Sequence, residues 1–176
     1  MLPKIIIPTR NEVDSYKKTP LPTEIVNEDN LCSCEINTII KQTVDSLLDI
    51  SNIKPDPNDM YYVDSKFGLD GSGSHNYRHQ LTSNEEDDLK GTNYIASFWC
   101  PLSIKDRNGQ KIWSNPMPNS IIYARPVTIV KAKETRGSIE EHFKPSLTSL
   151  KTNETVPLTS ESGFVFRVKT EISMVD

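Results

Sequence analysis

The sequence predicts an α+β fold with one mixed sheet. Three antiparallel strands are followed by a helix and then by a final parallel strand, and a further helix precedes them in the sequence. Three observations support this prediction. Strand-like runs rich in aromatic and β-branched residues recur after position 60. Hairpin-like links join the first of these runs to one another. A helical segment then precedes the last strand, and a crossover of this kind allows two strands to run parallel.

The region before position 60 divides into two segments. Residues 1–34 hold a short apolar run followed by prolines and acids, and we expect them to be extended or partly disordered. Residues 35–50 place apolar side chains at helical spacing, which predicts a helix with Ser33 as its cap and Glu35 in its first turn. Two prolines then end the helical tendency, so residues 35–59 are expected to form a helix and a linker before the core.

The first two strands of the core differ sharply from the segment between them. Residues 60–69 are aromatic and aliphatic and lead directly into Asp70. Residues 82–93 are polar and acidic, which is typical of a solvated loop. Residues 94–104 then predict a second strand, and Pro101 within it indicates a bulge or an edge position, because proline cannot donate a hydrogen bond to a neighbouring strand.

A hairpin and a further strand follow. Arg107-Asn108-Gly109 is a hairpin signal that leads into residues 111–113. Residues 126–132 form the next strand. Because the links between these strands resemble hairpins, the strands at 60–69, 94–104 and 126–132 are expected to be antiparallel neighbours.

The last part of the chain predicts a helix and a strand. Residues 138–150 read as a helix with Ser138 as N-cap, interrupted near Pro145. Residues 163–172 form the last strand, and Asp176 follows it. The helix allows a crossover, so the last strand can run parallel to the first.

If the last strand is parallel to the first, Asp70 and Asp176 lie at the same edge of adjacent strands. This order of strands is the ribonuclease-H-like layout. Residues 60–176 are therefore expected to form a ribonuclease-H-like core.

Composition and charge narrow the class of function. A chain of 176 residues is long enough for one domain with its own core. The net charge of −4 argues against a protein that binds nucleic acid unaided, because phosphate contacts require a basic face. An acidic nuclease core remains compatible with this net charge, since bound metal ions supply positive charge.

Three cysteines without a signal peptide predict reduced thiols. No apolar run approaches the roughly 20 residues of a membrane span, so we expect no membrane partner.

Two aspartates are the strongest candidates for a site. Asp70 opens the run Asp70-Gly71-Ser72-Gly73-Ser74-His75 at the end of a predicted strand. A carboxylate on rigid backbone, followed by glycines that let a metal or phosphate come close, suits a divalent ion. Asp176 would supply the second carboxylate of a two-metal site. The alternatives are that Asp70 merely ends a strand in a turn, and that Asp176 belongs to a frayed terminus.

Five features occur in one order along residues 60–176. They are Asp70-Gly71-Ser72-Gly73, Phe98 in a strand, Pro118-Asn119-Ser120, the strand at 126–132, and the aromatic strand at 164–168 that precedes Asp176. In this order they resemble the catalytic core of the recombination-activating recombinase of V(D)J recombination and its Transib-type transposase relatives.

The resemblance implies a function. Asp70 and Asp176 would be the first two acids of a DDE triad that uses Mg²⁺ or Mn²⁺ to nick DNA and transfer strands. It also implies DNA partners (transposon ends or recombination signals), a homodimer and a nuclear location. The family's third acid, a glutamate, lies after a large insertion with a zinc-binding region. This sequence stops before both, so a partial core that is inactive alone is expected. The alternatives are a domesticated or degenerate remnant that binds DNA or protein without catalysis, and an unrelated small α+β domain.

Four basic residues are candidates for DNA contacts. Arg125, Lys131, Lys133 and Arg136 form the most basic stretch of the sequence. In a DNA enzyme they would touch phosphates. The alternative is a solvated strand edge guarded by lysines.

Histidines, cysteines and tryptophans are weaker candidates. His75 and His79 are four residues apart and would share a metal on a helix, but the glycines before them favour a loop. Cys32 and Cys34 form half of a zinc site at most, because structural zinc takes four ligands. Core packing explains both Trp99 and Trp113 better than stacking on an unpaired base does.

Overall fold

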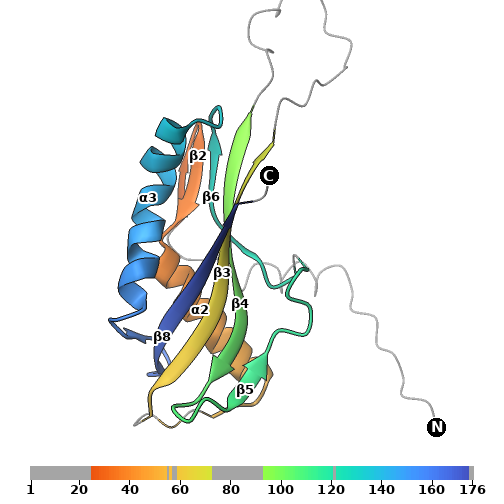
Figure 1. Cartoon of the computed structure of the whole chain (residues 1–176), viewed down its shortest axis with the longest axis vertical. Coiled ribbons are helices and arrows are strands. Elements are labelled where there is room, and N and C mark those ends of the chain that lie inside the picture. The colour runs from red at the N-terminus through yellow and green to blue at the C-terminus, as the bar shows by residue number, and fades with distance from the viewer. Residues whose placement is uncertain (1–24, 55, 57–58, 73–92, 121, 175–176) are drawn as a thin grey trace, which may run out of the picture.

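The structure, a computed structural model, describes residues 25–54, 56, 59–72, 93–120 and 122–174. These residues form a mixed, curled sheet and two helices (Figure 1). The elements are β1 Ile25–Glu28, β2 Leu31–Cys34, α2 Ile36–Ile50, β3 Tyr61–Ser72, β4 Tyr94–Lys105, β5 Lys111–Ser114, β6 Arg125–Lys131, α3 Arg136–Asn153, β7 Leu158–Thr159 and β8 Val165–Met174. The predicted α+β class is confirmed.

The order of strands in the sheet is β1-β2-β6-β4-β3-β8-β7, and β5 pairs with β4 beside this path. β3 is antiparallel to β4, and β4 is antiparallel to β6. β8 runs parallel to β3, with Tyr61 opposite Phe166 at one end and Leu69 opposite Met174 at the other. The chain therefore forms three antiparallel strands, a helix and a parallel strand, in the order that the sequence predicts.

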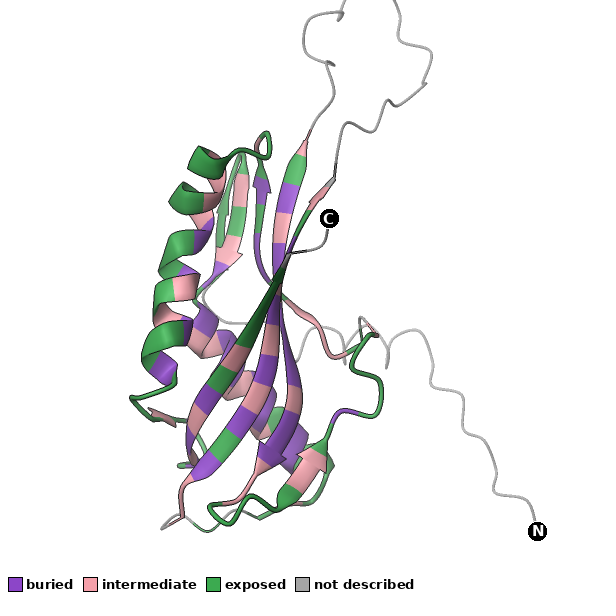
Figure 2. Ribbon diagram, in the orientation of Figure 1, coloured by how far each residue is buried: buried purple, intermediate pink, exposed green. Residues whose placement is uncertain are grey.

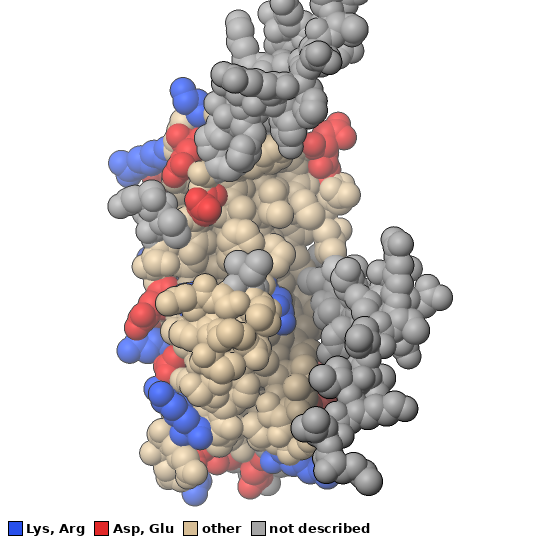
Figure 3. Space-filling view, turned by 90° about the vertical axis from the view of Figure 1, so that its right-hand side faces the viewer, with Lys and Arg blue, Asp and Glu red and all other residues tan. Residues whose placement is uncertain are grey.

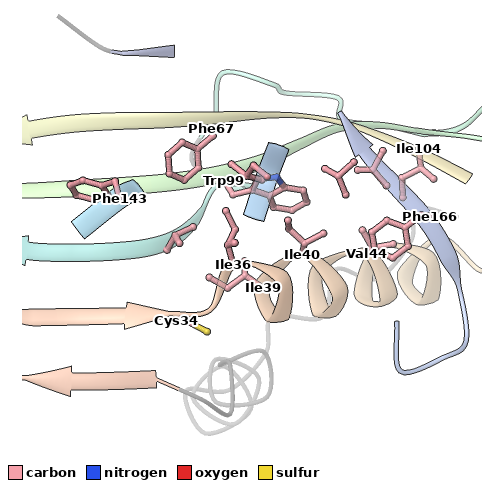
Figure 4. Packing of buried hydrophobic residues seen from close by; sticks show 14 of the residues in the cluster. Cys34, Ile36, Ile39, Ile40, Val44, Phe67, Trp99, Ile104, Phe143 and Phe166 are labelled. Atoms are coloured by element: carbon pink, nitrogen blue, oxygen red, sulfur yellow. The ribbon is translucent and has the colours of Figure 1, made fainter. Parts of the chain in front are cut away.

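Both helices pack against one face of this sheet. Alternate residues of β3 are buried, among them Val63 and Phe67, because successive side chains in a strand point to opposite faces (Figure 2). Ile40 of α2 and Phe143 of α3 belong to the same apolar cluster as these residues. Trp99 of β4 lies over α2 in this cluster (Figure 4). One hydrophobic core thus joins both helices to the sheet.

The opposite face of the sheet carries Asp64, Lys66 and Asp70 on β3, and we call it the open face. No helix covers it within the part of the chain that the structure describes. The connection from β5 to β6 crosses it in one place. There Asn115 donates from Nδ2 to the carbonyl of Pro101 at 2.9 Å, and Lys66 donates to Asn119 Oδ1 at 3.4 Å.

The N-terminal helix has a different cap from the one predicted. Ser33 lies in β2, and Glu35 is the N-cap of α2, with its Oε2 accepting from the backbone N–H of Thr38 at 2.7 Å. The reason is that the chain stays extended through Glu35, whose φ and ψ are −62° and 126°. A glutamate here reaches the same orphan N–H group that a shorter cap would satisfy.

Part of the segment expected to be extended contributes two strands. β1 and β2 form an antiparallel hairpin, and β2 continues the sheet by pairing with β6. The backbone N–H of Lys131 also donates to the carbonyl of Asn30 at 2.8 Å. The rest of that segment, residues 1–24, lies outside the described residues, as does most of the acidic segment at 82–93.

The second helix is longer than predicted and is not interrupted. α3 begins after Thr135, whose Oγ1 accepts from the N–H of Ser138 at 3.2 Å, so Ser138 is inside the helix and Thr135 is its N-cap. The helix continues through Pro145 to Asn153. Proline removes one backbone hydrogen bond, but the packing of Phe143 and Leu150 on the sheet holds the turns on either side.

The predicted bulge and hairpin in the middle of the chain are both confirmed. The register between β3 and β4 shifts between the pairs Asp64–Ser103 and Ser65–Pro101, so β4 holds one extra residue beside Pro101. After β4 a tight turn leads into β5, where Gly109 has a φ of 81° and donates to the carbonyl of Asp106. Only glycine adopts that φ without strain.

Candidate functional site

Asp70 lies near the end of β3, between two neighbouring strands. It pairs with Ala96 of β4, and the residue before it, Leu69, pairs with Met174 of β8. Leu69 is buried against the helices, so the alternation of the strand turns the Asp70 side chain to the open face, where it is exposed. The carboxylate is therefore fixed by backbone pairing on β3 and accessible to solvent.

The expected partner of Asp70 lies outside the described residues. Asp176 follows Met174, the last residue of β8, by two positions, and His75 and His79 are also outside the described part. Within the described residues, no group of three or more His, Cys, Asp and Glu side chains could hold a metal ion. Of the predicted pair, the described structure thus contains only Asp70. It lies on β3, which is parallel to β8, the strand that precedes Asp176.

The glycine after Asp70 has a neighbour that sequence reasoning missed. A Cβ added to Gly71 would overlap the carboxylate of Glu134, which precedes α3. Gly71 follows Asp70 in the alternation of β3, so this carboxylate approaches from the side of the helices and not from the open face. A larger residue at position 71 would therefore require the exposed Glu134 side chain to move aside. No signal in the sequence links the two residues, because they meet only through the pairing of β3, β4 and β6.

The four predicted DNA-binding residues do not form one cluster. Arg125 and Lys131 begin and end β6, which places them roughly 20 Å apart at about 3.3 Å per residue. Arg125 is half-buried and donates from Nη1 to the carbonyl of Ile122 at 3.0 Å. Lys131 and Lys133 lie near the start of α3, beyond the end of β6 that is opposite to Arg125.

Arg136, the fourth predicted DNA-binding residue, is exposed and already has a partner. Its Nε lies 2.9 Å from Glu140 Oε1 in an i, i+4 pair on α3. An exposed pair of this kind contributes little to stability and is screened by salt. Lys131, Lys133 and Arg136 are therefore near one another in the sequence, whereas Arg125 belongs to a separate part of the surface.

The cysteines and the tryptophan have different surroundings. Trp99 is fully buried in the core, as predicted. Cys32 is exposed, whereas Cys34 is buried. Burial raises the pKa of the Cys100 thiol, although Lys66, Arg125 and the amide of Asn115 oppose this effect. A buried thiol with a raised pKa is a poor nucleophile at neutral pH.

A pocket on the open face was not foreseen. It has a volume of about 360 Å³ and lies between β8, β3, β4 and β5. Asp64 lines it, with Ser103 Oγ donating to Asp64 Oδ2 at 2.8 Å and Lys105 Nζ forming an ion pair with the same oxygen at 2.5 Å. Charged residues at alternate positions of β3 and β8 are the signal in the sequence that could have located it.

Burial alone would raise the pKa of the Asp64 carboxyl. Hydrogen bonds from Lys105 and Ser103, together with the positive charges of Lys105 and Lys169, outweigh it and hold that pKa below its ordinary value. Asp64 is therefore ionised at neutral pH and fixes the Lys105 ammonium beside it.

On the side of the molecule shown in Figure 3, charged side chains lie mainly along the margins, and the centre is mostly uncharged apart from a small basic patch. Neither helix of the described part is long and apolar enough to cross a membrane. Compared with models of known protein families and with curated protein sequences, the chain matches none of them.

Proposed function

We propose that this chain is part of the catalytic core of a DDE recombinase or transposase, similar to the V(D)J recombination-activating recombinase and Transib-type transposases. The observation that supports the proposal is the path of the sheet. Three antiparallel strands, β3, β4 and β6, precede α3, and β8 then runs parallel to β3. A ribonuclease-H-like fold would place four neighbouring strands in the order β6-β4-β3-β8, and we infer that fold for residues 60–176.

In this proposal Asp70 and Asp176 hold a divalent ion at one end of the sheet. Asp70 suits the role because its carboxylate is exposed at the end of a strand with neighbours on both sides. Carboxylate oxygens are the ligands that Mg²⁺ and Mn²⁺ prefer. When bound, such ions activate the attacking oxygen and stabilise the leaving oxygen of a phosphodiester. The chain's own contribution is to fix Asp70 on β3, next to the parallel strand that leads toward Asp176.

The proposal extends to partners and location by resemblance. The partner would be DNA, as transposon ends or recombination signals, the assembly a homodimer and the compartment the nucleus. We assign no residue of this sequence as the third acid of the triad. The proposed activity of this chain is therefore metal binding, whereas nicking and strand transfer require that acid as well.

A metal titration tests the proposal. We expect weak binding of Mn²⁺, in the millimolar range, measured from the loss of the free-ion signal in electron paramagnetic resonance. Asp70→Asn should abolish it, because the amide is a neutral and poorer ligand at an otherwise unchanged position. Glu161→Gln is the matched control: it removes one negative charge from an exposed turn away from Asp70.

Equal binding by the wild type and Asp70→Asn would refute the metal site. Equal loss in Asp70→Asn and Glu161→Gln would also refute it, since the effect would then reflect net charge. Circular dichroism of each variant shows whether the fold is retained.

A further inference from the structure

The open face carries an excess of positive charge at the end of β3 opposite to Asp70. Alternation of the strands turns five cations and two anions to this region: Lys66, Lys105, Lys111, Arg167 and Lys169, with Asp64 and Glu171. Five minus two leaves a formal charge of +3, on a chain whose net charge is −4. This part of the surface is therefore basic although the protein is acidic.

The pocket on the open face lies within this basic region. Each of four adjacent strands contributes a charge to its lining, which holds three cations and two anions: Lys169 and Glu171 of β8, Asp64 of β3, Lys105 of β4 and Lys111 of β5. Asp64 is opposite Lys169 in the parallel register and forms an ion pair with Lys105. The negative charge of Asp64 is thus offset by Lys105 on one neighbouring strand, and Lys169 lies opposite Asp64 on the other.

Two of the pocket's lysines are not held in an ion pair. Among the described residues, neither Lys111 nor Lys169 has a carboxylate within ion-pair distance, although Lys169 lies opposite Asp64. Lys111 is moreover directly opposite Lys105 in the pairing of β4 with β5. Like charges directly opposite each other destabilise a sheet, and the ion pair with Asp64 offsets the charge of Lys105 but not that of Lys111. An anion in the pocket would offset the charge that remains on Lys111 and Lys169.

We propose that this pocket binds a backbone phosphate of duplex DNA. Lysine binds phosphate as a point charge with several donors, and a cavity of about 360 Å³ has room for one phosphate group. Cations that continue beyond the pocket, at Lys66 and Arg167, suit a polymer of phosphates better than a single small anion.

The distance to Asp70 fits the same partner. Asp64 and Asp70 are six residues apart on one strand, which is roughly 20 Å at about 3.3 Å per residue. A duplex rises about 3.4 Å per base pair, so DNA at Asp70 would reach the pocket roughly six base pairs away. This inference rests on the proposed function for the choice of DNA, and it adds a second contact that positions the duplex without touching the reacting atoms.

Fluorescence anisotropy with a labelled duplex of about 20 base pairs tests the inference at low salt. We expect the double variant Lys111→Gln, Lys169→Gln to bind about tenfold more weakly than the wild type. Its salt dependence should have a slope smaller by about two, since two phosphate contacts are lost. The control is Lys144→Gln, Lys151→Gln, which removes the same charge from exposed positions of α3.

The pocket proposal is overturned if both double variants lose affinity equally, because net charge would then explain the loss. It is also overturned if the wild type does not bind the duplex, or if single-stranded RNA or inorganic phosphate binds the pocket and the duplex does not. Mn²⁺ binding by the Lys111→Gln, Lys169→Gln variant should match the wild type. A failure of the pocket and a failure of the metal site at Asp70 are therefore seen separately.

Discussion

Two aspartates on one strand illustrate how local surroundings decide the role of a residue. Asp64 and Asp70 both lie on β3 and both face the open side of the sheet. Asp64 has Lys105 and Ser103 as partners, so its charge is already compensated by an ion pair and a hydrogen bond within the protein. Asp70 is exposed and has no such hydrogen bond or ion pair among the described residues. Asp64 therefore contributes to the stability of the sheet, whereas Asp70 is accessible to a ligand.

The lowered pKa of Asp64 predicts a pH-dependent contribution to stability. A carboxyl whose pKa is lower in the folded state stabilises the fold above its ordinary pKa, and the contribution is lost as the pH falls through the folded-state pKa. We expect Asp64→Asn to lower the free energy of unfolding by about 1 kcal/mol at neutral pH. This difference should shrink below the ordinary pKa of 3.8 and disappear in stronger acid.

Urea unfolding of Asp64→Asn and the wild type at several pH values measures this effect. Glu161→Gln, at an exposed turn, should show little difference from the wild type at any of them. A gap between Asp64→Asn and the wild type that stays constant from neutral to acidic pH would show that the ion pair with Lys105 does not cause it.

Residues of the candidate site were predictable to different degrees. Asp70 was found because a strand pattern ends at it and glycines follow, and both signals are local. The contact between Gly71 and Glu134 was not found, because it requires the register of three strands. Arg125 and Lys131 belong to one basic stretch of the sequence, whereas in the structure they lie at opposite ends of β6.

At the scale of elements, the periodicity of apolar residues located the helices and strands, but not their ends. Both helix caps were assigned to serines, and the structure uses Glu35 and Thr135 instead. A cap depends on where the backbone leaves the extended conformation, which several neighbouring polar residues can satisfy. The helix is also not interrupted at Pro145, contrary to the prediction from the sequence. There the packing of α3 on the sheet outweighs the local preference against proline.

The uninterrupted α3 carries a measurable cost at Pro145. This residue is exposed and inside the helix, so one backbone hydrogen bond of the helix is absent and the proline ring is not buried in the core. We expect Pro145→Ala to raise the free energy of unfolding by about 1–2 kcal/mol, since a helix-interior proline costs roughly 3 kcal/mol and its effect on the unfolded chain offsets part of this.

Chemical denaturation of Pro145→Ala beside Lys144→Ala tests this expectation. Lys144 is the exposed neighbour, and its change to alanine should alter stability by less than about 0.5 kcal/mol. Destabilisation by Pro145→Ala would mean that the proline ring makes a contact that the helix needs.

At the scale of the whole molecule, the order and direction of the central strands were predictable because hairpin links and a helical crossover permit few arrangements. The hairpin β1–β2 was not predicted, since each of its strands has only four residues and β1 is exposed along its whole length. The sequence divides at position 60 in pattern, yet Ile40 of α2 is fully buried in the same cluster as Phe67 and Phe166 (Figure 4).

Sharing one core implies that α2 and the sheet unfold together. We expect Ile40→Ala to destabilise the whole molecule by about 2–5 kcal/mol, because it leaves a cavity between α2 and the sheet. The signal would be the fluorescence of Trp99 on β4, recorded in a Trp113→Phe background. Ser46→Ala, on the exposed side of α2, serves as the control.

Circular dichroism should follow the same transition as Trp99 fluorescence in Ile40→Ala. Two separate transitions, with the Trp99 signal unchanged, would show instead that α2 is an independent unit.

The parallel pairing of β3 with β8 also determines when the fold can be completed during synthesis. Ser65 and Thr170, which share a hydrogen bond at 2.9 Å, are 105 positions apart. Until β8 leaves the ribosome, β3 has β4 on one side and open hydrogen-bonding groups on the other, although it becomes an interior strand of the finished sheet. Contacts of such high sequence separation form slowly, and an open edge invites pairing with other chains. The nascent protein is thus most vulnerable to aggregation just before its last strand arrives.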